Sequence, residues 1–131
     1  MEVLPHLRVL NLDSCEHVRG DLEHLAPLTK LEILDLQECS WVRGNLRSLS
    51  RLTRLQGLNL KNCTEVQGDF SSLSPLKNLR KLWLCNCRQI TGELSELAAN
   101  QFPLQKLGLR GCRLVRGSLS ALAGLTKLQE L

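Results

Sequence analysis

Residues 31–49 read LEILDLQECSWVRGNLRSL, and the chain repeats this stretch about five times. Each copy follows the pattern LxxLxLxxCxx(V/I)xGx(L/F)xxL, and the copies begin at Leu7, Leu31, Leu55, Leu79 and Leu104. Three of the start-to-start spacings are 24 residues and one is 25. A period of this length predicts a solenoid, because one such repeat cannot bury its apolar face alone and must stack on its neighbours.

The repeats predict a single array over residues 1–131, with partial repeats at both ends. Residues 4–6 resemble the end of a preceding repeat, and residues 128–131 resemble the start of a following one. Neither end carries a recognisable polar cap. We therefore expect a monomer whose exposed terminal leucines allow end-to-end association.

The first half of each repeat alternates apolar and polar residues, which is typical of a strand with one buried face. In the second repeat, Leu34 and Leu36 are expected to point into the core, and Ile33, Asp35 and Gln37 to point to solvent. Stacking the copies places these strands in parallel, about 4.8 Å apart.

The second half of each repeat predicts a turn and then a short helix. The branched residue of (V/I)xG is expected to pack inward, and its glycine to allow a tight or left-handed backbone. The next residue is a good helix N-cap in four of the five repeats, namely Asp21, Asn45, Asp69 and Ser118. Leucines at three-residue spacing then predict a short helix or 3₁₀ turn on the convex side. Residues 94–100 are the best candidate for an α-helix, and Phe102 should replace the leucine of the other repeats.

The six cysteines do not predict a disulfide scaffold or a zinc site. Five occupy the same repeat position, and only Cys85 lies outside it; the five are Cys15, Cys39, Cys63, Cys87 and Cys112. The chain has no CxxC pair and no histidine at ligand spacing from two cysteines. We interpret the five as buried free thiols with a packing role, with redox sensing as the alternative.

Composition and motifs exclude several classes of function. The net charge is +4, and the basic residues are interleaved with acidic ones, which does not favour nucleic-acid binding. No apolar stretch is long enough to span a membrane, and the free cysteines and the lack of a signal-like segment favour the cytoplasm. No phosphate-binding glycine motif is present, and no histidine pairs with a nucleophile and a carboxylate. We expect neither a cofactor nor a metal, and we expect that the chain is not an enzyme.

The LxxLxLxxC core, recurring five times in register over essentially the whole chain, resembles the leucine-rich repeat family. The 24-residue length and the glycine after the cysteine look like the plant-type subclass, but cysteine replaces the usual asparagine and Gly-Asp-Leu or its variants replace Gly-x-Ile-Pro. Such repeats look like those of algal and other protist members. The resemblance implies an α/β fold, a right-handed curved solenoid with a parallel β-sheet on its concave face. It also implies protein or peptide binding on that sheet.

The exposed positions of the sheet vary strongly from repeat to repeat, while the leucines hardly vary. The candidate binding residues are therefore at these exposed positions: Asn11, Asp13, Ile33, Asp35, Gln37, Asn59, Lys61, Lys81, Trp83, Lys106 and Arg110. The first repeats are acidic and the later ones basic along this face, which predicts an orienting field for a charged partner. The alternative is a mixed surface that only keeps the protein in solution.

Three further features have two interpretations each. Trp83 is either an interface residue or an aromatic cover for a neighbouring strand. Cys85 is either a reactive thiol or an incidental one. Arg19, Arg43 and Arg116 either form an edge for an acidic partner or phosphate, or are simply solvated. The leading hypothesis is a non-enzymatic protein-interaction module; the alternative is a structural or regulatory segment of a larger signalling or immune-receptor-like protein.

Overall fold

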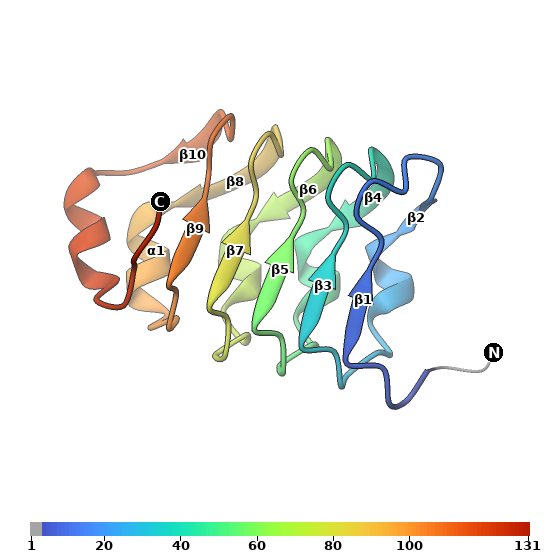
Figure 1. The fold of residues 1–131 in the computed structure, drawn as a ribbon. Coiled ribbons are helices and arrows are strands. Elements are labelled where there is room, and N and C mark those ends of the chain that lie inside the picture. The colour runs from blue at the N-terminus through green and yellow to red at the C-terminus, as the bar shows by residue number, and fades with distance from the viewer. Residues whose placement is uncertain (1–3) are drawn as a thin grey trace.

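The computed structural model describes residues 4–131 and shows a right-handed solenoid with two parallel sheets and short convex helices (Figure 1). The concave sheet has the strand order β1-β3-β5-β7-β9. Its strands are β1 (Val9–Asn11), β3 (Ile33–Asp35), β5 (Gly57–Asn59), β7 (Lys81–Trp83) and β9 (Lys106–Gly108). Equivalent repeat positions pair directly, as in Ile33 with Gly57 and Gly57 with Lys81. The predicted strands and their inward and outward faces are therefore confirmed.

A second parallel sheet, which the sequence analysis did not predict, lies behind the first (Figure 1). The (V/I)xG segments, interpreted above as turns, form its strands: β2 (Arg19–Asp21), β4 (Trp41–Asn45), β6 (Glu65–Asp69), β8 (Gln89–Glu93) and β10 (Leu114–Arg116). The branched residue of each segment packs inward while the residues on either side stay exposed, as Val42 does between Trp41 and Arg43. This alternation is that of a strand, but three residues are too few to distinguish it from a turn by pattern alone.

Strands of the second sheet pair with an offset that differs from the repeat. Arg19 pairs with Trp41 and Arg43 pairs with Glu65, so partners are two residues short of the 24-residue period. The concave sheet has no such shift. Side chains that occupy equivalent repeat positions are therefore not direct neighbours on this second sheet.

The convex segments follow the predicted capping residues. They are η1 (Leu22–Leu25), η2 (Leu46–Leu49), η3 (Phe70–Leu73), α1 (Leu94–Ala99) and η4 (Leu119–Gly124). The four predicted N-caps each accept a hydrogen bond from the backbone N–H two residues on, whereas Glu93 before α1 makes no such bond. The predicted helix is confirmed at Leu94–Ala99, and Phe102 is buried.

Leucines of consecutive repeats form one continuous core, and four cysteines belong to it. Each of these thiols donates to a backbone carbonyl of the preceding repeat, with sulfur–oxygen distances of 2.8 to 3.2 Å for Cys39, Cys63, Cys87 and Cys112. Burial raises the pKa of Cys63 to about 12 and that of Cys112 to about 11. All six thiols are free, and Cys15 in the first repeat is only half-buried. The geometry agrees with a packing role, because a thiol with a raised pKa is a poor nucleophile.

Candidate functional site

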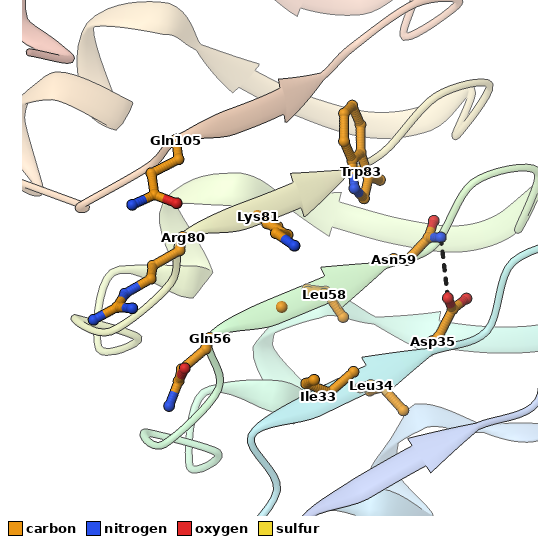
Figure 2. A pocket seen from close by; sticks show the side chains of 11 residues that line it. Ile33, Leu34, Asp35, Gln56, Leu58, Asn59, Arg80, Lys81, Trp83 and Gln105 are labelled. Atoms are coloured by element: carbon orange, nitrogen blue, oxygen red, sulfur yellow. Dashed lines mark hydrogen bonds between the residues drawn. The ribbon is translucent and has the colours of Figure 1, made fainter. Parts of the chain in front are cut away.

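The structure gathers the predicted binding residues on one face. Ile33, Lys81 and Lys106 lie at the first position of their strands, and Trp83 lies at the last position of β7. Their side chains are on the solvent side of the concave sheet, and Figure 2 shows those of β3, β5 and β7 around one hollow. The remaining predicted residues are at strand ends or in the turns that follow: Asn11, Asp13, Asp35, Gln37, Asn59, Lys61 and Arg110.

Three of these predicted residues also shape the backbone. The side-chain oxygens of Asn11, Asp35 and Asn59 each accept a hydrogen bond from the N–H two residues later, at 2.9, 3.0 and 3.1 Å. Such Asx turns end the strand and start the bend toward the second sheet. The recurrence of Asn or Asp at this position is therefore a sequence signal for the turn, and these residues are not only variable surface positions.

A second row of side chains, at the eighth position of each repeat, forms a ladder across the turns. Asn86 donates to the Asn62 carbonyl oxygen at 2.7 Å, and Asn62 donates to the Glu38 carboxylate at 2.6 Å. These residues have left-handed backbones, with φ of 62° or 63°. Gly111 continues the row where a side chain would overlap the Asn86 amide. Asparagine and glycine suit this conformation, whereas glutamate adopts it at a cost.

Replacing Glu38 with asparagine should stabilise the fold by about 0.5 to 1 kcal/mol, because asparagine adopts a left-handed backbone more easily. The new amide oxygen should still accept from Asn62, since Asn62 and Asn86 bridge the same spacing at 2.7 Å. Urea unfolding measures the effect. Glu38→Ala is the control: it loses the acceptor as well and should destabilise the chain. A Glu38→Asn chain no more stable than the wild type would contradict this account.

Trp83 lies over the neighbouring strand β9. It pairs with Gly108, and a side chain at Gly108 would overlap the indole and the Cys85 sulfur. The indole is half-buried in this position, and its free part faces the concave surface (Figure 2). Gly108 is therefore needed to accommodate Trp83, and Trp83 in turn separates two hollows of the face.

The first hollow is lined by Gly57, which lies on the central strand β5 of the concave sheet, and is called here the Gly57 hollow. Figure 2 shows the side chains around it. It has a volume of about 400 Å³. Its lining is Ile33, Leu34, Asp35, Gln56, Gly57, Leu58, Asn59, Arg80, Lys81, Trp83 and Gln105. Ile33 is 45% exposed here, so an apolar wall stands beside the glycine.

The second hollow lies on the other side of Asn59 and Trp83 and is called here the basic hollow. Its volume is about 520 Å³, and it is lined by Gln37, Asn59, Lys61, Trp83, Cys85, Asn86 and Arg110. Two cations and three amides thus surround it, with no carboxylate in its lining. Cys85 belongs to this lining and is half-buried there.

Acidic and basic side chains of the face differ in their bonding. The acids are engaged within the protein: Asp13 accepts from Ser14, Asp35 from Asn59 and Glu38 from Asn62. Among residues 4–131 the ion pairs are Arg8 with Glu32 at 3.0 Å and Lys106 with Glu130 at 3.4 Å. The other cations of the face therefore form no salt bridge within the described chain: Lys61, Arg80, Lys81 and Arg110.

The arginines of the second sheet are not a continuous basic edge. Because of the shifted pairing, Arg43 lies between Asp21 and Glu65, and Arg116 pairs with Glu93. Arg19 pairs with Trp41, which is 63% exposed. The repeat alone suggested a row of arginines, whereas the pairing alternates charges across the strands.

Away from the concave face, one pair of carboxyl groups has shifted pKa values. Burial raises the pKa of Glu96, and the neighbouring Asp69 raises it further. Burial also raises the pKa of Asp69, but hydrogen bonds from Ser71 and Thr91 outweigh that effect, and its net shift is downward. No group of three or more His, Cys, Asp or Glu among residues 4–131 is arranged to hold a metal ion. No helix within those residues has the length and apolar character needed to cross a membrane.

Two sheets of parallel strands, convex 3₁₀ turns and a leucine core define a leucine-rich-repeat solenoid. The fold is similar to that of internalin C2 of Listeria monocytogenes, which supports this assignment of the fold. The TM-score is 0.54 at 19% identity, with 94% of this chain and 69% of the internalin covered. The chain belongs to the family of Zer-1-like leucine-rich repeats, whose model matches residues 22–99, more than half of the sequence.

Other solved structures are more distant matches. A second Listeria monocytogenes internalin has a TM-score of 0.46 at 21% identity, with 98% of this chain and 48% of that one covered. The plant peptide hormone receptor RGFR1, solved in complex with RGF2, has a TM-score of 0.48 at 22% identity, with 98% and 28% covered. The chain therefore spans half or less of these two proteins. A search of curated proteins finds no significant match.

Proposed function

We propose that this chain is a non-enzymatic interaction module that binds a protein or peptide on its concave sheet. The observation that carries the proposal is the separation of charge along that face: the acids Asp13, Asp35 and Glu38 lie in the first two repeats and are hydrogen-bonded to neutral side chains, while the cations of the later repeats form no salt bridge within residues 4–131, namely Lys61, Arg80, Lys81 and Arg110. Charges left unpaired on one face favour an acidic partner, chiefly through the rate and orientation of association.

The fold supports the same conclusion. Leucine-rich repeats serve as interaction surfaces because their core positions are fixed while their exposed strand positions are free to vary. Here the variable positions include a half-buried tryptophan and two hollows. Four expectations stay predictions: that the chain binds neither nucleic acid nor membrane, that it is monomeric, that it forms a single array, and that its repeats are of the algal or protist type.

The test compares two matched triple variants. The concave variant carries Trp83→Ala, Asp35→Asn and Lys81→Glu, in which asparagine at position 35 keeps the acceptor of the Asx turn. The control variant also changes one tryptophan, one acid and one cation, but on the second sheet, with Trp41→Ala, Glu65→Gln and Arg43→Glu. Proteins captured from a cell extract by each tagged chain are identified and quantified by mass spectrometry.

We expect the concave variant to lose at least nine-tenths of the captured partner, and the control to capture it as the wild type does; loss of a hot-spot residue costs about 2 kcal/mol or more. Circular dichroism and urea unfolding must show that both variants fold. Equal capture by the wild type and the concave variant would contradict the proposal and favour the alternative, a structural or regulatory segment.

A further inference from the structure

We infer that the ligand of the concave face is an extended acidic peptide segment. One apolar side chain of this segment enters the Gly57 hollow, and a carboxylate two to four residues away along the peptide enters the basic hollow. The inference rests on the proposed function and names the chemistry of its partner. Three observations carry it: an unexplained glycine, a hollow lined by cations, and the distance between the two hollows.

Gly57 has no structural explanation in the fold. Its backbone does not need the left-handed region, and a Cβ built there has Ile33 Cγ1 at 4.0 Å as its nearest neighbour, an ordinary contact. Gly108 and Gly111, in contrast, sit where a Cβ would overlap neighbouring side chains. Glycine weakens a strand and often marks a place where a ligand approaches closely.

The hollow above Gly57 suits an apolar side chain. The equivalent positions on the flanking strands carry Ile33 and Lys81, so a missing side chain leaves a gap between an isoleucine and an aliphatic lysine stem. Trp83 closes one end of this gap (Figure 2). A leucine-sized group placed there would bury apolar surface against the exposed Ile33 side chain, which favours binding.

The basic hollow suits a carboxylate. Lys61 and Arg110 border it and form no salt bridge among residues 4–131. The amides beside them are already bonded to each other and to the acids, as Asn59 is to Gln37 and Asp35. An anion therefore supplies what the cations lack, and an arginine can bind a carboxylate through two parallel hydrogen bonds.

The two hollows are close enough for one short peptide. They share Asn59 and Trp83, and each extends from that boundary in the opposite direction. Gly57 and Asn59 are two residues apart on β5, and Lys61 follows two residues later. At about 3.3 Å per residue, Gly57 and Asn59 are roughly 7 Å apart. Because the chain turns after Asn59, Lys61 lies less than the roughly 13 Å of a fully extended strand from Gly57, a distance that an extended peptide covers in two to four residues.

A displayed library of random peptides tests the inference, with selection on the wild-type chain alone. The most enriched peptide is then synthesised and titrated by calorimetry against purified variants. Gly57→Ile fills the hollow with the residue found on the neighbouring strand, and Gly57→Ala fills it partly. Gln67→Ile places the same side chain on the second sheet as a matched control. Lys61→Gln with Arg110→Gln removes the cations.

We expect the selected peptides to share an apolar residue and an Asp or Glu two to four residues apart. Gly57→Ile should weaken binding at least tenfold, Gly57→Ala less, and Gln67→Ile not measurably. The cation variant should weaken binding about tenfold and reduce its dependence on salt. Urea unfolding should show that Gly57→Ile is at least as stable as the wild type, because isoleucine favours strands.

A selected peptide that binds the Gly57→Ile chain with unchanged affinity would overturn the inference, as would enriched peptides without an acidic residue or a library that yields none. The proposed function is judged separately by capture from the extract. If Gly57→Ile captures the natural partner normally while the concave triple variant does not, the concave face binds its partner without the two hollows, and only the inference fails.

Discussion

Gly92→Ala is expected to destabilise the fold by about 3 kcal/mol or more, a large part of the 5 to 15 kcal/mol that stabilises a typical domain. Gly92 is buried in β8, and a methyl group there would overlap the ring of Phe70, which is itself 1% exposed. Neither group can move outward, because the ring lies in the core between two repeats. Urea unfolding monitored by circular dichroism measures the loss.

Two controls isolate the contact with the ring. Gly20 occupies the same repeat position with a similar φ of 150°, but the nearest atom to its added methyl group is 4.0 Å away, so Gly20→Ala should cost about 1 kcal/mol. Phe70 replaces the leucine of the other repeats, so Phe70→Leu should partly rescue Gly92→Ala. Equal losses for the two alanine variants would show that the ring yields to the methyl group and that the packing argument is wrong.

The free energy of unfolding should fall steeply between about pH 9 and pH 12, because the four buried cysteine thiols stay protonated in the folded chain and ionise in the unfolded chain. Burial raises the pKa values of Cys39, Cys63, Cys87 and Cys112 above the ordinary value of 9.0. Below pH 9 both states hold these protons, and the full contribution is present. Above it the unfolded state loses them first, so each thiol lowers the free energy of unfolding by about 1.4 kcal/mol per pH unit.

Urea unfolding at a series of pH values from neutral to alkaline measures this loss. The chain has no tyrosine, so no phenol titrates in the same range. Cys63→Ala removes one thiol and its bond to the Leu36 carbonyl. It should be less stable at neutral pH and show a shallower alkaline slope. A wild-type chain whose stability is unchanged from pH 8.5 to 10.5 would mean that the thiols ionise without unfolding, contrary to their burial.

Sequence reasoning predicted the parts of the fold that the leucine period controls. Leu34 and Leu36 lie in the core as expected, and the helix at Leu94–Ala99 lies where the longer fourth repeat provides an extra residue. These features depend on burial and capping, which repeat in the sequence and can be read from one copy. The position of each candidate residue on the concave face followed for the same reason.

Other features depend on contacts between repeats, which the pattern of one repeat does not contain. The Asn62 and Asn86 ladder requires a backbone conformation that brings equivalent side chains together. The Gly57 hollow is defined by what its neighbours leave empty, and Trp83 leans over Gly108 rather than standing free. The second sheet was missed because Trp41–Asn45 and its equivalents are too short for their alternation to be distinguished from a turn.

The shifted pairing of the second sheet limits how this array can be cut and rearranged. Each concave strand meets its equivalent in the next repeat, so an exchanged repeat keeps its register there, provided that pairs such as Trp83 and Gly108 stay together. On the second sheet, Arg43 pairs in register with Glu65, which belongs to the following copy, at an offset two residues short of the repeat. A repeat that is duplicated, deleted or moved to another place in the array keeps its own arginine, but a different residue then pairs with that arginine. Chimeras are therefore better joined within a convex turn, with both partners of each such pair carried over together.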